Sequence, residues 1–505
     1  MTWRRMAATA AGILATCAAA FGQSAPSRDG SVAELQREIA ELRQRLLELE
    51  NRATAVEAPR TIEREAADYL RDLRQPEAGG NVSAPGVAGI TVGGDLRLRA
   101  EWYQRRTFSS DESEDFEDRY LYRARINLGV DVDEGTKAFL QAVQAGTFGT
   151  DLTQSSVPGG FPVGNPGTGG GGGSVTDELH VRQAYLDFND LFGSGWDVRV
   201  GRQALEYGEG RILGENDWEQ FTNVFDAARV STNFDELAVD LIGAKLFDDF
   251  TADPTNTTSA DVNVLGTYLS WAGDVISADG YAFYLDVNGA TGGGAGPPLG
   301  EQERITLGGR LAGDYDFLDW GFEMAVQQNE RTNGSSHVHF SEAYGIHGHV
   351  GLSLAEEMEF SPRVYASYDR GSDDFMNLAP NYHDFAGMMD IVKNWENLID
   401  YAIGIDLELT EDWSIGGAWH WFQYHQQPAG VSGMKNIGQE FDLVVSGRCT
   451  DRLNMELGWG HFFAQEGIDI FPATNNGSLT PSAVWFPSGD DDDADFVYVQ
   501  LGVPF

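Results

Sequence analysis

The sequence is poor in cysteine and in basic residues, and each shortage excludes a class of protein. Its 505 residues include only two cysteines, Cys17 and Cys449. Because Cys17 falls in the export signal described below, no disulfide framework or thiolate metal site follows. Asp and Glu number 78 against 34 Lys and Arg, a formal net charge of −44. Phosphate binding needs a basic face, so we expect no nucleic-acid partner.

Long apolar runs are confined to the N-terminus. Arg4 and Arg5 precede an apolar stretch over residues 6–20 and small residues near position 22, which predicts a signal peptide over residues 1–22. A lipoprotein signal ending at Cys17 is the alternative, although Thr16 is unusual before such a cysteine. No later stretch of 18 or more apolar residues occurs, which excludes an inner-membrane helical protein. An exported chain without such helices is periplasmic, extracellular or a membrane barrel.

The segment after the signal has helical periodicity. Over residues 31–56 apolar residues recur three and four positions apart, with charged residues between them, which predicts a short coiled-coil helix. One amphipathic helix lying on the rest of the protein is the alternative. Residues 57–89 are linker-like and could hold a short helix. We expect the coiled coil in the periplasm, where it would self-associate or bind a periplasmic partner.

From residue 90 onward the pattern has period two. Tyr122, Ile126 and Leu128 share one face of a segment whose other face carries Arg123 and Arg125. Alternation over more than ten residues is long for a soluble strand but suits a strand tilted across a bilayer. The pattern recurs to the end, where the final strand finishes on an aromatic residue. We predict an all-β fold, a transmembrane antiparallel β-barrel over residues 90–505 with room for roughly 16 to 18 strands.

One run of motifs is specific. Residues 197–208 (DVRVGRQALEYG) lead into residues 211–214 (RILG), Asp217-Trp218 and residues 225–230 (FDAARV). This run resembles the alginate-export family, and residues 181–188 are also similar to it. The resemblance implies a monomeric outer-membrane barrel of about 18 strands, without a cofactor, whose electropositive constriction passes an anionic polysaccharide. The coiled coil, a glycine-rich loop at 169–173 and the scarcity of lysine depart from the family and leave the substrate open.

Arginines supply the candidate site. An arginine on the lipid face at mid-bilayer costs about 2–4 kcal/mol, so arginines of the strands should face the lumen and bind anions there. The alternative for any single arginine is a salt bridge that ties adjacent strands, because acids such as Asp95, Glu101 and Asp217 are near in sequence. The arginines expected to line the pore are Arg97, Arg99, Arg123, Arg125, Arg182, Arg202, Arg211, Arg229, Arg304 and Arg310.

Other chemistry has weaker support. His347 and His349 share one face of a strand, as do His337 and His339, but no third ligand has a diagnostic spacing, so we expect no metal site. The aspartates at 490–493 lack the spacing of a calcium-binding loop. No catalytic motif of a hydrolase or nucleotide-binding enzyme occurs, so we expect no enzyme.

Three functions remain open. The first is a passive outer-membrane pore for an anionic, alginate-like polysaccharide or oligosaccharide. The second is a general or anion-selective porin for small anions, similar to phosphate-selective porins, which also combine a coiled coil with an arginine-lined lumen and would be trimeric. The third is a structural barrel, embedded in outer-membrane lipid, whose coiled coil tethers the membrane to the cell wall.

Overall fold

The structure is a computed structural model of a chain that divides into two compact units, Met1–Glu65 and Ala66–Phe505. It describes residues 89–104, 116–148, 156–157, 173–174, 179–248, 260–289, 302–315, 317–333, 336–339, 342–354, 360–373, 375–392, 395–427, 435–468 and 493–505. The predicted signal peptide (1–22), coiled coil (31–56) and nearly all of the linker (57–89) lie outside the described residues. All described residues belong to the second unit.

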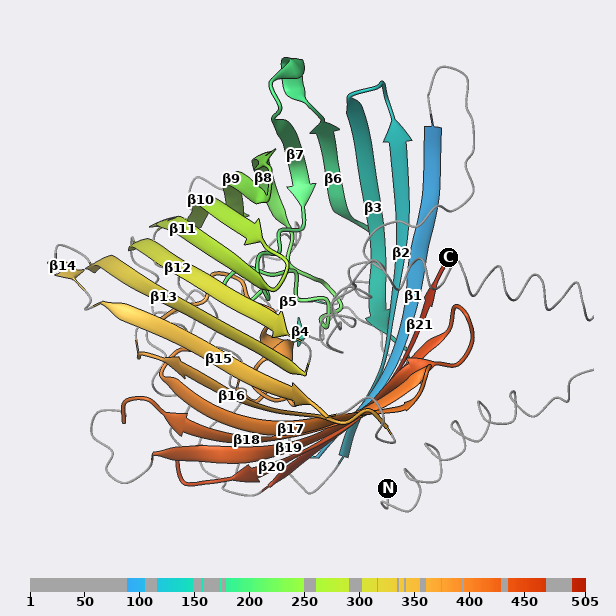
Figure 1. Ribbon diagram of the computed structural model, residues 1–505, viewed down its shortest axis with the longest axis vertical. Coiled ribbons are helices and arrows are strands. Elements are labelled where there is room, and N and C mark those ends of the chain that lie inside the picture. Colours follow the sequence, from blue (N-terminus) through green and yellow to red (C-terminus); the bar gives the residue numbers. More distant parts are fainter. Residues whose placement is uncertain are drawn as a thin grey trace, which may run out of the picture. The chain divides into compact units, whose positions relative to one another are not determined.

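Nearly all of the described secondary structure is one antiparallel sheet (Figure 1). Its strands are β1 (Gly89–Gln104), β2 (Phe116–Asp131), β3 (Thr136–Thr147), β6 (His180–Phe188), β7 (Asp197–Gln203), β8 (Phe225–Phe234), β9 (Leu237–Asp248), β10 (Ala260–Ala272), β11 (Ile276–Gly289), β12 (Gln302–Tyr315), β13 (Leu318–Asn333), β14 (Ser336–His339), β15 (Ala343–Ser353), β16 (Arg363–Gly371), β17 (Leu398–Thr410), β18 (Trp413–Tyr424), β19 (Asn436–Arg448), β20 (Asn454–Ala464) and β21 (Ala494–Pro504). A separate ribbon joins β4 (Ser156–Val157) to β5 (Gly173–Ser174).

The sheet closes on itself, because β1 pairs with β2 on one side and with β21 on the other. The strand β14 pairs with the end of β13, beyond the stretch of β13 that pairs with β15. It therefore adds no position around the wall, and the 19-stranded sheet forms a closed barrel of 18 strands. This confirms the predicted barrel and its strand number.

Side chains alternate across the wall as the sequence pattern predicts. Leu96, Ile126 and Ile305 are 39%, 52% and 45% exposed, whereas their neighbours Arg97 and Arg125 are 7% and 5% exposed. Apolar side chains face outward, where lipid replaces water, and polar side chains face the interior. Among the described residues, no helix has the length and apolar character needed to cross a membrane.

The two ends of the barrel differ in their connections. Short turns at 132–135, 235–236, 273–275 and 411–412 join strands at the end that holds Gly89 and Phe505. There, Gly94 and Phe505 exchange two backbone hydrogen bonds of 2.9 Å that secure β1 to the last residue. The opposite end carries the long connections.

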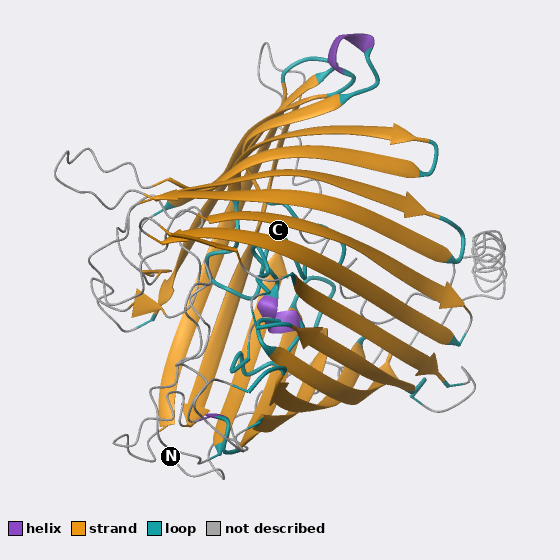
Figure 2. Ribbon diagram, turned by 90° about the vertical axis from the view of Figure 1, so that its left-hand side faces the viewer, coloured by secondary structure: helices purple, strands orange, loops and turns teal. Residues whose placement is uncertain are grey.

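Two of these long connections fold back into the barrel (Figure 2). We call them segment A (204–224, between β7 and β8) and segment B (375–392, between β16 and β17). They are bonded to each other: the Gly214 amide donates to the Ala379 carbonyl at 2.7 Å, and the Asn381 amide donates to the Gly210 carbonyl at 2.9 Å. Buried apolar side chains of both segments pack with those of β8–β11, β13 and β15 in one core. Neither segment has the period-two pattern of a strand. Their apolar residues do not face lipid but are buried against the inner wall.

Candidate functional site

Arginines of β1 and β2 point into the barrel and hold the end of segment A. Arg97 donates to the backbone carbonyls of residues 217, 218 and 219 at 2.6–3.0 Å, and Arg123 donates to the carbonyls of 217 and 219 at 3.0 Å. The Asp217 carboxylate accepts from Arg123 at 2.9 Å and from Arg125 at 2.7 Å. Arg125 also bonds Asp95 of β1 at 2.6 Å. Segment A therefore supplies both a carboxylate and neutral carbonyl oxygens to this group.

Arg182 of β6 extends the same group. Its guanidinium donates to Thr222 Oγ1 at 2.5 Å, and it also bonds the side chains of Glu215 and Gln141. Four of the predicted arginines from β1 and β2, together with Arg182, thus converge on residues 215–222. We call this set, with Arg119 of β2 and its partner Glu101, the arginine wall. Its arginines are Arg97, Arg99, Arg119, Arg123, Arg125 and Arg182.

A stack of three side chains joins the arginine wall to both inward segments. The Arg99 guanidinium lies 3.7 Å from the centre of the Trp218 ring, and His383 of segment B stacks on Trp218 at 3.7 Å and 5°. His383 in turn contacts Asp390 at 3.1 Å. Burial by itself would lower the pKa of His383, but the Asp390 carboxylate outweighs burial and raises that pKa above its ordinary value. The imidazolium form of His383 therefore persists to higher pH than that of an ordinary histidine.

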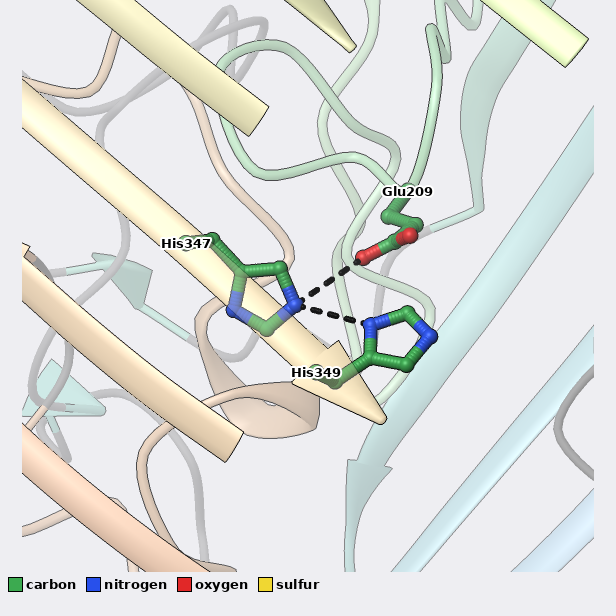
Figure 3. A group of neighbouring side chains, drawn as sticks. All are labelled: Glu209, His347 and His349. Atoms are coloured by element: carbon green, nitrogen blue, oxygen red, sulfur yellow. Dashed lines mark hydrogen bonds and ion pairs between the residues drawn. The ribbon is translucent and has the colours of Figure 1, made fainter. Parts of the chain in front are cut away.

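A second group of charged side chains lies where segment A meets β12, β15 and β16. Arg211 bonds Glu209 at 3.1 Å, Asp369 at 3.0 Å and the His347 Nε2 atom at 3.1 Å. Arg310 of β12 bonds Glu209 at 2.9 Å and Asp279 at 3.3 Å. Figure 3 shows Glu209 approaching His347 and its neighbour His349 on β15. The structure thus places Arg211 and Arg310 together, but in a different group from the arginine wall.

The remaining predicted arginines lie apart. Arg304 of β12 is buried and bonds Gln327 at 2.8 Å. Arg229 of β8 lies beside Tyr207 of segment A.

The structure corrects the predicted location of Arg202. It pairs in register with Ala184 and Asp226, on the face that carries Val200, which is 47% exposed. Its guanidinium bonds the exposed Asp226 carboxylate at 2.8 Å. Arg202 therefore lies on the outer face, and its predicted place in the lumen is wrong. The outward position is tolerable because it comes at the end of β7, and the cost of an arginine on the lipid face falls to about 0–1 kcal/mol near the interface.

Acidic side chains gather on the part of the wall formed by β17–β19. Glu440 and Asp442 are buried there and accept hydrogen bonds from the backbone amides of Met389, at 2.8 Å, and Met388, at 3.2 Å. Asp400 is also buried and contacts His420 at 2.8 Å. We call Asp400, Glu440 and Asp442 the acidic wall. Segment B anchors there through its own amides, just as segment A anchors to the arginine wall through its carbonyls.

Sequence reasoning named Asp217 as a possible partner of these arginines, but it missed segment B and its contacts with segment A. Tyr382 bonds Glu219 across the two segments, a contact between residues far apart in the chain. The available signal was negative: residues 204–224 and 375–392 interrupt the alternation without the glycine-rich composition of a simple loop. Such an interruption indicates an ordered connection but not its partners.

Comparison with known proteins agrees with the fold. The family model described as alginate export matches residues 89–469, which covers most of the barrel. No curated protein matches the chain. The chain is similar in structure to OccK9 (OpdG) of Pseudomonas aeruginosa, with a TM-score of 0.52 at 10% identity over 82% of this chain and 98% of that one. It is also similar to OpdK of the same organism, solved with vanillate, with a TM-score of 0.51 at 10% identity over 82% of this chain and 98% of that one.

At such low identity these likenesses show the fold alone, that of an outer-membrane porin barrel. The family match, by contrast, extends over more than half of the chain and includes both inward segments. It points to a transport channel rather than an enzyme. The chain therefore forms an outer-membrane pore and belongs to the alginate-export family.

Proposed function

We propose that this pore passes an anionic, alginate-like polysaccharide or oligosaccharide by passive diffusion, and that the arginine wall is the binding surface along its path. The observation that carries the proposal is an excess of positive charge at this wall. Among the described residues, six guanidiniums contact four carboxylates there, those of Asp95, Glu101, Glu215 and Asp217. The other acceptors include carbonyls of residues 217–219, which carry no net charge.

The chemistry of the wall suits a uronate. A guanidinium presents a planar fork of donors that matches a carboxylate in two-point contact, and it stays protonated under all relevant conditions. Several such groups in a narrow path concentrate anions and repel cations. Exchange of one carboxylate for the next along a polymer needs no cofactor and no energy input.

The test is block of single-channel current by oligouronates in planar bilayers. Arg97→Gln combined with Arg123→Gln should weaken block by alginate oligomers about tenfold, because two positive charges are removed and each acts on a nearby anion by about 0.5–1 kcal/mol even at the dielectric constant of water. Arg202→Gln is the matched control, because Arg202 lies on the outer face, and it should leave block unchanged. Equal block of wild-type and doubly substituted channels, or equal effects of both changes, would refute the proposal.

The acidic wall favours a second candidate, a general porin for small solutes. Carboxyl groups of the acidic wall and guanidiniums of the arginine wall offer small polar solutes both acceptors and donors, and this mixture does not by itself favour a polymer. Reversal potentials with small anions, compared with block by vanillate and by alginate oligomers, separate the two. Strong block that grows with oligomer length supports the polymer pathway; block by single carboxylates independent of length supports the general porin.

A further inference from the structure

Three potential ligand atoms converge between segment A and β15 (Figure 3). His347 Nε2 lies 3.1 Å from His349 Nδ1 and 3.9 Å from Glu209 Oε2. In the part of the chain that the structure describes, this is the one group of three or more His, Cys, Asp and Glu ligand atoms within 4.8 Å of one another. At metal–nitrogen distances of about 2.0–2.1 Å, two nitrogens 3.1 Å apart subtend nearly a right angle at a shared ion. Two imidazoles and one carboxylate are a common donor set for first-row divalent metals.

Carboxylates and a guanidinium lie next to the three ligand side chains, on the side away from the shared ion. Metal-binding histidines usually offer their other ring nitrogen to a carboxylate, which fixes the ring and raises its basicity. His347 Nδ1 lies 3.0 Å from Asp369 Oδ1, and His349 Nε2 lies 3.9 Å from Asp319 Oδ1. Glu209 Oε1 accepts from Arg310 at 2.9 Å, and Oε2, which also accepts from Arg211 at 3.1 Å, lies toward the histidines. His347 and Glu209 therefore each have a hydrogen-bonded partner that orients them, and His349 has a carboxylate 3.9 Å away.

Arg211 is the group that opposes a cation here. Its Nη2 atom lies 3.1 Å from His347 Nε2, so an ion must displace this hydrogen bond, while Arg211 keeps its bonds to Asp369 and Glu209. The net charge of the surroundings nevertheless favours a cation, because carboxylates outnumber guanidiniums. Among the described residues, three guanidiniums, those of Arg211, Arg310 and Arg363, pair with five carboxylates, those of Glu209, Asp279, Asp319, Asp369 and Asp406.

We infer that Glu209, His347 and His349 bind one divalent transition-metal ion of the Zn²⁺ class, which ties segment A to β15. Glu209 comes from segment A and both histidines come from the barrel wall, so the ion acts as a cross-link between the inward segment and the barrel. This is a structural role, independent of the solute that passes the pore.

Binding is measured on the full-length protein in detergent, after chelator treatment, by titration calorimetry with Zn²⁺. The ligand set is read from the visible absorption of bound Co²⁺. We expect one saturable site per chain, abolished by His347→Ala and by His349→Ala. Asp369→Asn should retain the Co²⁺ spectrum but weaken Zn²⁺ binding about 10- to 100-fold, because it removes only the orienting carboxylate. Heat-dependent gel migration confirms that each variant is a folded barrel.

His337→Ala combined with His339→Ala is the matched control, since this is the other His-x-His pair of the chain. It should leave Zn²⁺ affinity unchanged. The inference is overturned if folded wild-type protein shows no saturable Zn²⁺ binding. It is equally overturned if binding survives His347→Ala, or is lost with the control pair.

Discussion

Asp217 offers the sharpest test of how charge is arranged in the pore. Its carboxylate lies 2.9 Å from Arg123, 2.7 Å from Arg125 and 4.0 Å from Arg97, and it is partly accessible to the lumen. Asp217→Asn removes one negative charge from the arginine wall and keeps an oxygen acceptor. Six arginine bonds to the carbonyls of residues 217–219 remain, so segment A should stay in place.

The magnitude follows from Coulomb's law. The interaction energy between a unit charge and a permeant anion is about 1 kcal/mol at 4 Å and about 0.5 kcal/mol at 8 Å, even at the dielectric constant of water. At physiological ionic strength, interactions between exposed charges are largely screened beyond about 8 Å, so the effect is confined to anions close to Asp217. Removal of the Asp217 charge should therefore raise the anion-to-cation permeability ratio roughly two- to fivefold, since 1.4 kcal/mol corresponds to a factor of about ten.

The assay is the reversal potential of single channels in a KCl gradient. Asp235→Asn is the matched control: Asp235 lies in the exposed turn between β8 and β9 at a φ of 52°, which asparagine tolerates. The reasoning is refuted if Asp217→Asn leaves the permeability ratio unchanged, or shifts it no more than Asp235→Asn does.

Three further predictions test the fold around this site. The pKa of His383 is raised in the folded state, so its pairing with Asp390 should stabilise segment B fully at pH values below the ordinary histidine pKa. This stabilisation should be lost as the pH rises through the raised pKa. Hydrogen exchange of segment B, corrected for intrinsic rates, should show the loss in wild type but not in His383→Gln. Ile126→Arg places a charge on the outward face and should cost about 2–4 kcal/mol in unfolding experiments in lipid, unlike Ile126→Leu. Gly387→Ala should loosen segment B, since Gly387 has a φ of 79° and an added Cβ would lie 2.5 Å from the Glu440 carboxylate, and protease cleavage within segment B should then accelerate.

The barrel was predictable because a bilayer imposes one rule on every strand. Lipid on one side and water on the other force side chains to alternate, so Arg123 and Arg125 faced inward from the pattern alone. Arg202 shows where the motif was followed against this rule. It is in phase with Val198 and Val200, which the alternation places on the outer face, but the family motif suggested the lumen. At the end of a strand, near the interface, an outward arginine costs little.

The contacts that define the site were beyond the reach of sequence reasoning. Arg97 bonds residues 120 to 122 positions away, and the Asn216 amide bonds a side chain 165 positions away. Nothing in local periodicity selects such partners, because the two inward segments follow the shape of the wall and of each other. For the same reason the third ligand beside His347 and His349 was not found: Glu209 belongs to segment A, far earlier in the chain.

The inward segments also decide where selectivity resides. A barrel of 16 to 18 strands leaves a water-filled channel when nothing enters it, so the wall alone would discriminate weakly. Segment A brings carbonyl oxygens and a carboxylate to the arginine wall, and segment B brings amide donors to the acidic wall. The oxygens of segment A thus offset part of the positive charge of the arginine wall, and the amides of segment B offset part of the polarity of the acidic wall. A solute meets the electrostatic potential that is left uncompensated. Small changes on segment A should therefore alter selectivity more than equal changes of charge elsewhere on the barrel.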